Sequence, residues 1–299
     1  MNKDIIFLSP VCTHNIWGGT RLNREFGYPI EGDDIGECWG ISAHPNGDGT
    51  VASGAYQGMK LSELWEKHPE LFGNTGMDRF PLLIKIIDAR SDLSIQVHPD
   101  NIYAKEHENG SLGKTECWYI LDCEPGTTIV IGHHAKDKEE LKQMVEEKRW
   151  KDLIREVPVK KGDFYQINPG CVHAIKGGTV ILETQQSSDI TYRVYDYDRK
   201  WNGKLRELHV KQSLDVIKTP FQPEKDQRSI THTEGADLEH LETCPYYTVE
   251  KYDIHGNWEH SFKAGFVNVS VIEGEGTINE KEIRKGDHFI VPVDFGSCH

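Results

Sequence analysis

The chain has 299 residues, of which 37% are hydrophobic and 27% charged, and its formal net charge is −14. This length can bury a substantial core in about two domains, or in one large β domain. Because nucleic-acid affinity comes from clustered Lys and Arg, an acidic balance of this size opposes nucleic-acid binding, and an anionic ligand would need a local positive site.

The apolar runs and the cysteines argue against two further classes, exported or membrane proteins and proteins held by disulfides or thiolate-bound zinc. The apolar run after Met1 is too short for a signal peptide, and no later stretch approaches the roughly eighteen apolar residues of a membrane span. The seven cysteines are an odd number without a C-x-x-C pair, which argues against a disulfide framework and a thiolate zinc site. We therefore expect a cytoplasmic protein with reduced thiols and no membrane partner. The oligomeric state stays open.

Strand-like runs dominate the chain and are separated by Gly, Pro, Asn and Asp. Three helical patterns interrupt them, and their apolar residues recur at helical intervals, so we expect these helices to cover the sheet. In chain order the predicted elements are a helix at 61–70, strands at 80–88, 93–98, 117–122 and 128–131, a helix at 137–157, strands at 164–167, 179–183 and 190–195, and a helix at 206–218. This order predicts a mainly antiparallel sandwich or barrel.

The last third of the chain repeats part of the first. Residues 219–235 are rich in Pro, Gln, Asp and Thr and are expected to form a linker. Beyond it, 284–292 matches 160–169 in a basic pair, a Gly-Asp turn and an apolar strand that ends at a proline. We therefore predict a catalytic domain at 1–218 and a second, degenerate domain at 236–299. Because the chain stops where another turn and strand should begin, we expect the sequence to be truncated at its C-terminus.

Two short motifs predict a metal site. Gln96 and His98 alternate on one predicted strand and share a face, and Lys114 and Glu116 do likewise on the next. His173 adds a second imidazole. Two histidines, a carboxylate and an amide with open positions suit Zn²⁺ acting as a Lewis acid, one ion per chain. Glu116 could instead pair only with Lys114, and Gln96 is either a ligand or a neighbour of one.

The strand from residue 190 predicts a cationic face. Thr191, Arg193 and Tyr195 alternate onto one side, and continuing the alternation adds Tyr197 and Arg199. A guanidinium fork can bind phosphate or neutralise an enediolate. The alternative is an exposed edge that carries charges, and for Arg199 this alternative stays open.

The order of these motifs carries a family resemblance. The segment 162–173, with the pattern G-D-x-x-x-x-N-P-G-x-x-H, resembles the cupin superfamily of small metal-binding β-barrels. Together with four other segments, this motif resembles type I mannose-6-phosphate isomerase (phosphomannose isomerase) in its short bacterial form. The four segments are Gln-Val-His-Pro-Asp at 96–100, Lys-Thr-Glu at 114–116, Leu-Glu at 182–183, and 188–193. Upstream, 15–19 and 37–45 fit as well, so the resemblance covers residues 5 to about 218. One departure is Gln96, which stands where many cupins have a histidine.

The resemblance implies a fold of two cupin-like β-barrel (jelly-roll) domains with a few covering helices. It also implies a zinc-dependent isomerase that interconverts D-mannose 6-phosphate and D-fructose 6-phosphate through a cis-enediol, so the partner is a small sugar phosphate. The resemblance assigns zinc to Gln96, His98, Glu116 and His173, an essential arginine to Arg193, and a place facing the cavity to Glu183. The candidate bases are Glu183 and, beside a metal cation, Lys114. The further candidate substrate contacts are Trp17, His44 and Arg199. In longer family members a lysine stands near the place of Arg199.

Two other classes use related sites. An iron oxygenase also takes two histidines and one carboxylate, but the Gln-x-His start and the arginine strand disfavour it. A non-catalytic sugar-binding cupin would be expected to lose ligands in the first barrel, whereas here they are missing only from the second.

Overall fold

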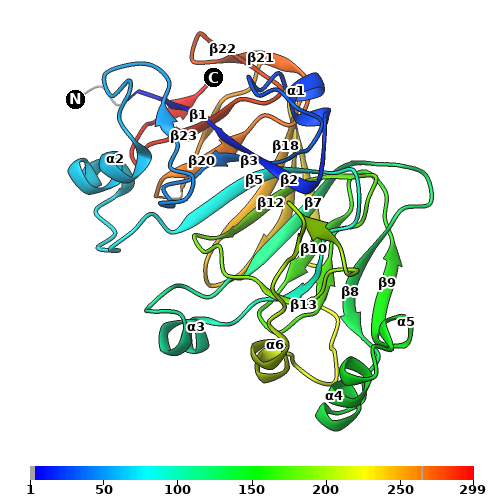
Figure 1. The fold of residues 1–299 in the computed structure, drawn as a ribbon. Coiled ribbons are helices and arrows are strands. Elements are labelled where there is room, and N and C mark those ends of the chain that lie inside the picture. Colours follow the sequence, from blue (N-terminus) through cyan, green and yellow to red (C-terminus); the bar gives the residue numbers. More distant parts are fainter. Residues whose placement is uncertain (1–3, 264) are drawn as a thin grey trace.

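The computed structural model describes residues 4–263 and 265–299 and is built mainly from β-strands, with short helices at the periphery (Figure 1). This confirms the predicted mainly β class. Within the described residues, no helix is both long and apolar enough to cross a membrane.

The largest sheet has six strands in the order β10-β7-β12-β5-β2-β3. At its centre, β12 pairs antiparallel with both β5 and β7, so that side chains far apart in sequence stand in register. Its strands are β2 (Val11–Gly19), β3 (Ile35–Ile41), β5 (Leu82–Ala89), β7 (Glu116–Cys123), β10 (Phe164–Ile167) and β12 (Thr179–Gln186).

A second sheet has five strands in the order β13-β6-β11-β8-β9 and faces the first. Trp118 and Ile181 from the six-stranded sheet meet Ile129 and Ile131 from the five-stranded sheet in one buried apolar cluster. These two sheets therefore face each other, and the described residues contain no closed barrel. The strands of the second sheet are β6 (Ile95–Val97), β8 (Thr128–His133), β9 (Ile154–Pro158), β11 (His173–Ala174) and β13 (Tyr192–Tyr195).

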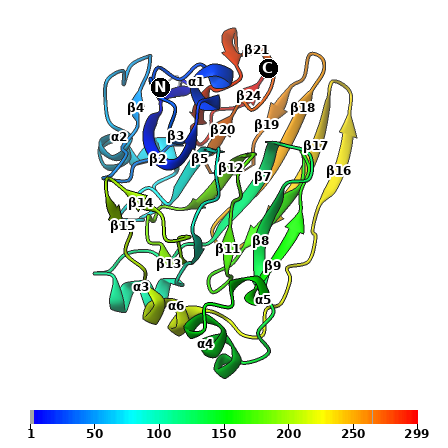
Figure 2. The same ribbon diagram turned by 45° about the vertical axis from the view of Figure 1, so that its right-hand side comes forward.

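Helices cover the outer face of the five-stranded sheet, as Figure 2 shows. Apolar residues of β6, β8 and β13 pack there against α4 (Lys138–Glu146), α5 (Trp150–Leu153) and α6 (Val210–Val216). The predicted helix 137–157 is wrong in its second half. Lys148 adopts a left-handed φ of 54°, which interrupts the helix, and the chain then leaves α5 directly for strand β9 at the edge of the sheet.

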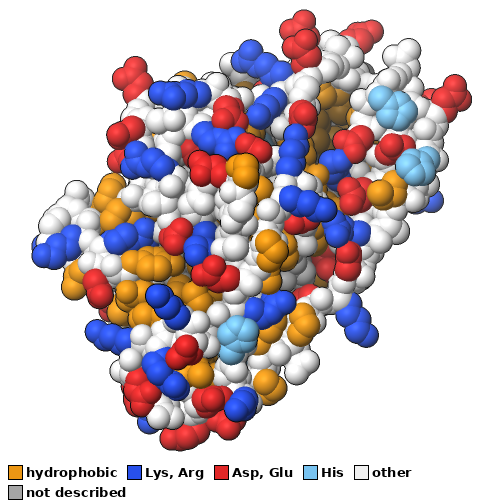
Figure 3. Space-filling view, turned by 90° about the vertical axis from the view of Figure 1, so that its right-hand side faces the viewer, with side chains coloured by type: hydrophobic (Ala, Val, Ile, Leu, Met, Phe, Trp, Pro, Cys, Tyr) orange, Lys and Arg blue, Asp and Glu red, His pale blue; other side chains and the backbone are white. Residues whose placement is uncertain are grey.

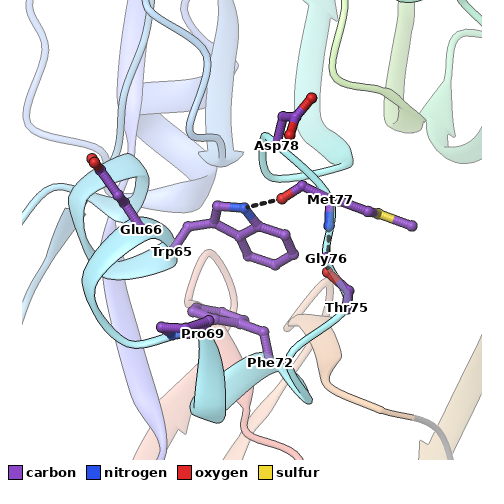
Figure 4. A pocket seen from close by; sticks show the side chains of 8 residues that line it. All are labelled: Trp65, Glu66, Pro69, Phe72, Thr75, Gly76, Met77 and Asp78. Atoms are coloured by element: carbon purple, nitrogen blue, oxygen red, sulfur yellow. Dashed lines mark hydrogen bonds between the residues drawn. The ribbon is translucent and has the colours of Figure 1, made fainter.

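Three other helical segments and a 3-10 turn surround the six-stranded sheet or its loops. They are α1 (Arg21–Phe26), α2 (Leu61–Lys67), η1 (Pro69–Phe72) and α3 (Asn101–His107). A cavity of about 240 Å³ lies beside α2 and η1, where the indole of Trp65 donates to the Met77 carbonyl above the ring of Phe72 (Figure 4). Its lining contains no histidine, no lysine and none of the predicted site residues.

The N-terminal strand joins the C-terminal part of the chain. The sheet β20-β23-β1-β4 pairs β1 (Ile6–Ser9) with β23 (His288–Val291), so the two predicted domains share a sheet, and their division at 219–235 stays a prediction. The remaining strands are β4 (Thr50–Val51), β14 (Lys200–Trp201), β15 (Lys204–Leu205), β16 (Ser229–Thr233), β17 (Ala236–Thr243), β18 (Thr248–Ile254), β19 (His260–Ser261), β20 (Val267–Ser270), β21 (Glu275–Ile278), β22 (Lys281–Arg284) and β24 (Ser297–Cys298).

The predicted repeat is visible in two turns with the same hydrogen bonds. The Asp163 carboxylate accepts from the Lys160 amide at 2.9 Å, and the Asp287 carboxylate accepts from the Arg284 amide at 2.8 Å. The glycine before each aspartate has a positive φ, 89° in the first turn and 98° in the second, which explains why Gly-Asp recurs. Strands β10 and β23 follow these turns.

Candidate metal centre and active site

His98, Glu116 and His173 meet between the two sheets. His98 follows β6, Glu116 begins β7 and His173 begins β11, and each side chain is at most 1% exposed. The Nε2 atoms of the two histidines lie 3.1 Å apart and 3.4 and 3.3 Å from the oxygens of Glu116. Their possible ligand atoms all fall within 4.8 Å of one another, so the predicted three-residue cluster exists.

The protonation of this cluster fits a cation. Burial lowers the pKa of His98 to about 3 and also lowers that of His173, so both imidazoles are neutral, the form that binds a metal. Burial alone would raise the pKa of Glu116, but Lys114 and the histidines hold it well below its usual value. Lys114 is the only cationic side chain among the described residues that forms an ion pair with Glu116, at 2.9 Å, and neither Glu116 oxygen has a well-aligned hydrogen bond there, so the carboxylate keeps the capacity to bind a cation.

Hydrogen bonds around the triad orient His173. Its Nδ1 lies 2.9 Å from the Cys171 carbonyl, an acceptor, so Nδ1 carries the proton and Nε2 directs its lone pair toward the centre of the triad. Gln96 stands next to it, with the amide 3.3 Å from His173 Nε2 and directly opposite His173 in the pairing of β6 with β11. Gln96 therefore belongs to the cluster, as a ligand or as its nearest amide.

A row of alternating charges runs from the triad along the inner face of the six-stranded sheet. Lys114 Nζ lies 2.9 Å from Glu116 and 3.8 Å from Glu183, and Lys85 Nζ lies 3.6 Å from Glu183 and 3.5 Å from Glu37. Lys85, Lys114 and Glu183 are at most 5% exposed, so these interactions are little screened by water. We call these five residues the charge ladder.

Glu183 and Lys114 have displaced pKa values. Burial and the nearby charge of Glu116 raise the pKa of Glu183, while Trp118 Nε1 donates to its Oε2 at 3.0 Å. Burial would lower the pKa of Lys114, but the carboxylates of Glu116 and Glu183 outweigh it and raise the pKa overall. As a base, Lys114 would therefore need a metal charge beside it, whereas Glu183 already has the character of a proton acceptor of moderate strength.

Sequence reasoning missed Lys85 as a member of the site. The lysine interrupts a strand, Leu82–Ala89, that is otherwise apolar apart from Asp88, and β5 lies in the interior of the sheet. A lysine there must be paired, which was the available signal. Its ammonium also lies 4.9 Å from the centre of the Trp39 ring, and Trp39 Nε1 donates to Glu37 at 2.7 Å.

Arg193 lies on the five-stranded sheet, which also carries His173. It pairs with Gln96, which in turn pairs with His173, so these three residues share one face. Arg193 Nη1 donates to the Glu207 carbonyl at 2.7 Å, and its Nε has no hydrogen-bond partner in the described residues. The prediction that Tyr195 shares this face is wrong. A bulge after Arg193 turns Tyr195 outward, where its ring stacks on Trp150 at 4.5 Å.

The predicted substrate contacts occupy three different places. His44 Nε2 lies 3.6 Å from Asp189, and its ring is 5.8 Å from that of Trp39, next to the end of the charge ladder. Arg199 binds Asp196 and the Asp92 carbonyl near Arg193. Trp17 is 4% exposed and packs in the apolar cluster between the sheets, outside the polar group, so its role as a pocket wall stays a prediction.

Comparisons with known proteins point to one family. Residues 5–124 match the family described as phosphomannose isomerase type I, catalytic domain, and 237–299 match mannose-6-phosphate isomerase, cupin domain. Mannose-6-phosphate isomerase ManA of Bacillus subtilis is 49% identical, over 99% of this chain and 95% of its own. A mannose-6-phosphate isomerase of Streptococcus mutans is 48% identical, over 96% of this chain and 92% of its own.

Solved structures agree with the sequence comparisons. The crystal structure of mannose 6-phosphate isomerase from Bacillus subtilis superposes with a TM-score of 0.97 at 46% identity, covering 99% of this chain and 96% of its own. A putative mannosephosphate isomerase from Archaeoglobus fulgidus has a TM-score of 0.67 at 22% identity, over 98% of this chain and 93% of its own. The second likeness shows the shared fold alone.

Proposed function

This chain belongs to the type I phosphomannose isomerase family, and from that premise we propose that it interconverts D-mannose 6-phosphate and D-fructose 6-phosphate through a cis-enediol intermediate. The enzyme class is that of an aldose–ketose isomerase. One observation supports the mechanism most strongly. A neutral-imidazole and carboxylate triad, a buried charge ladder and Arg193 all line the space between two facing sheets.

The triad fits a single zinc ion. His98, Glu116 and His173 would hold it, and Gln96 is the nearest further donor. A set of imidazoles and one carboxylate that leaves positions open for substrate is typical of catalytic zinc. Bound there, zinc would act as a Lewis acid on the oxygens of the substrate.

The charge ladder would move the proton. Isomerisation removes a proton from a carbon next to a carbonyl, and the best base has a pKa near the working pH. The pKa of Glu183 is raised toward that range, and its Oε1 accepts no hydrogen bond in the described structure, so it is free to take a proton. Lys114 is the alternative base, and together with Lys85 it would stabilise negative charge on the enediolate.

Arg193 and the arginines near it would bind the anionic part of the reaction. A substrate that carries a phosphate needs fixed positive charge in a protein whose formal net charge is −14. On the face drawn in Figure 3, basic and acidic side chains are interspersed, so a fixed cluster around Arg193 and Arg199 would provide what the general surface does not. His44 would contact the sugar at the other end of the site.

We place this enzyme in the cytoplasm. The proposal is supported by the seven cysteines, which are all free thiols. It is also consistent with a phosphorylated sugar as substrate.

Metal analysis combined with NMR tests this function. The purified enzyme should contain one zinc per chain, lose activity with a chelator and regain it with zinc. During turnover in deuterium oxide, solvent deuterium should appear at C1 of fructose 6-phosphate, the carbon that receives the proton. Full activity without metal would contradict the zinc site, and isomerisation with no exchange over many turnovers would contradict a solvent-accessible cis-enediol.

A further inference from the structure

Three arginines gather around one buried carboxylate beside the proposed active site. Asp196 is 4% exposed and binds Arg199 at 2.6 Å and Arg206 at 2.5 and 2.7 Å. Arg193 lies beside them, because its Nη1 donates at 2.7 Å to the carbonyl of Glu207, the residue that follows Arg206. Burial and then repulsion from Arg206 lower the pKa of Arg193. The cluster thus holds three positive groups and a single buried negative one.

The position of Arg193 relates this cluster to the metal triad. Neighbouring strands lie about 4.8 Å apart, and Arg193 is two strands away from His173 on the same face. Its backbone is therefore about 10 Å from that of His173. A hexose phosphate has a reactive carbonyl at one end and a phosphoryl group at the other, and its length is of the same order.

Free hydrogen-bond donors distinguish the arginines. A guanidinium carries five N–H groups on three nitrogens. Arg199 uses all three nitrogens on protein acceptors, namely the Asp92 carbonyl and two atoms of Asp196. Arg206 uses Nε and Nη2, both on Asp196, and its Nη1 has no partner among the described residues. Arg206 therefore has an Nη1 group free to donate to a ligand, whereas Arg199 has no nitrogen without a protein acceptor.

Asp196 also fixes the segment that carries this edge. Arg199 and Arg206 flank the hairpin of β14 and β15, which lies next to β13 in Figure 2, and one carboxylate ties both ends together. The residue after Arg206 is Glu207, whose carbonyl accepts from Arg193 Nη1. Removing the Asp196 charge would free both arginines and weaken the positioning of Arg193.

We propose that Arg206 binds the phosphoryl group of the substrate, and that Asp196 is the positioning residue that holds Arg206 in place. The inference rests on the proposed function for the identity of the ligand, a phosphate monoester. Arg199 braces the hairpin and adds positive charge. Residues 193–207 contain five basic and three acidic side chains, an excess of positive charge in an acidic protein.

Variants of Arg206 test the proposal in the zinc-loaded, full-length enzyme. We expect Arg206→Gln to raise both the KM for mannose 6-phosphate and the dissociation constant of inorganic phosphate by about tenfold or more, with a smaller change in kcat, because phosphate contacts are uniform binding. Arg206→Lys, which keeps the charge but loses the fork, should lie between wild type and Arg206→Gln. Arg199→Lys should weaken phosphate binding less than Arg206→Lys does.

A second set of variants separates positioning from folding. Asp196→Asn should weaken phosphate binding, although the side chain at position 196 does not contact the phosphate. Asp226→Asn is the matched control, because it removes the charge of an exposed Asp226–Arg228 pair with contacts of 2.9 to 3.2 Å, and it should change neither constant. Thermal unfolding shows whether each variant folds. If Asp196→Asn does not fold, the phosphate affinity of Arg206→Lys still tests whether Arg206 binds the phosphoryl group.

Calorimetry with inorganic phosphate distinguishes this proposal from the function on which it rests. Phosphate binding needs no turnover, so a wild-type protein that binds phosphate through Arg206 but does not isomerise would overturn the proposed function alone. An Arg206→Gln variant with wild-type phosphate affinity and wild-type KM would overturn the Arg206 site and place the anion elsewhere, at the metal or at Arg199.

Discussion

Lys85 and Glu183 face each other directly across two neighbouring strands, with Nζ 3.6 Å from Oε1. The register continues on both sides, since Glu183 stands opposite Trp118 on β7 and Lys85 stands opposite Trp39 on β3. Each tryptophan contacts its charged neighbour, one by a hydrogen bond and the other through its ring face. Sheet register thus holds an acid and a base in contact within an apolar frame.

This arrangement predicts the effect of Glu183→Gln. The amide keeps the shape and the contact with Trp118 but cannot accept the proton, so kcat should fall by about two to four orders of magnitude. Zinc content should stay at the wild-type level, because the triad does not include this residue. Deuterium exchange into fructose 6-phosphate measures the proton step. Exchange at the normal rate would assign the base to Lys114, and Lys114→Met should then abolish it.

The double variant His98→Ala with His173→Ala should bind almost no zinc and still fold. The apolar cluster between the sheets contains neither histidine, so its packing does not depend on an ion. Metal content by mass spectrometry and far-UV circular dichroism check the two halves of this prediction. If the variant unfolds, the metal is structural as well as catalytic. His134→Ala is a suitable control, because His134 is exposed and lies outside the triad.

The metal triad could be predicted from sequence, but the charge ladder could be predicted only in part. Gln96 and Glu116 fall on strands, His98 directly follows one, and the alternation of these residues is visible in the motifs. His173 follows a glycine turn typical of the family. Lys85 has no motif, and its partner Glu183 lies 98 positions later, so only the register of β5 with β12 joins them. The prediction for Tyr195 was wrong for a related reason, because a bulge changes the side of the sheet to which a strand residue points.

A buried histidine predicts how stability depends on pH. His288 is 1% exposed and lies 2.8 Å from both the Tyr28 and the Ser270 hydroxyls, and burial lowers its pKa to about 4. The unfolded chain, with a histidine pKa of about 6.5, binds the proton more readily. The contribution to stability is therefore complete above about pH 6.5 and is lost as the pH falls toward 4, by about 3 kcal/mol in total.

Urea unfolding at several pH values checks this effect. His288→Gln removes the titration while keeping an amide that can bind both hydroxyls, so its stability should fall less steeply than that of wild type between pH 6.5 and 4. Other groups titrate equally in both proteins and cancel in the difference. Parallel curves for the two proteins would show that His288 does not carry this pH dependence.

The same histidine explains a glycine on β3. A Cβ added at Gly40 would lie 2.3 to 2.4 Å from the His288 ring, closer than side-chain carbons approach. Gly40→Ala should therefore destabilise the protein by about 1–3 kcal/mol through overpacking. Combining it with His288→Ala should relieve the clash, so the two changes should be non-additive in denaturant unfolding. Strictly additive effects would show that the ring moves aside without cost.

Arg193 is predicted to be catalytic rather than structural. Its Nε lacks a partner, and it shares a face with Gln96 and His173. Charge that develops on the enediolate would strengthen the contact in the transition state more than in the ground state. Arg193→Ala should lower kcat by about two or more orders of magnitude, as loss of a typical oxyanion donor does, and leave zinc content unchanged.

The division between kcat and KM decides the role of this arginine. If Arg193 only held the phosphate, its loss would raise KM and leave kcat near normal, as expected for uniform binding. The electrophilic role would then belong to the metal and to Lys114. A kcat loss in Arg193→Ala together with a KM increase in Arg206→Gln would instead assign the two arginines to different parts of the substrate, Arg193 to the reacting oxygens and Arg206 to the phosphoryl group.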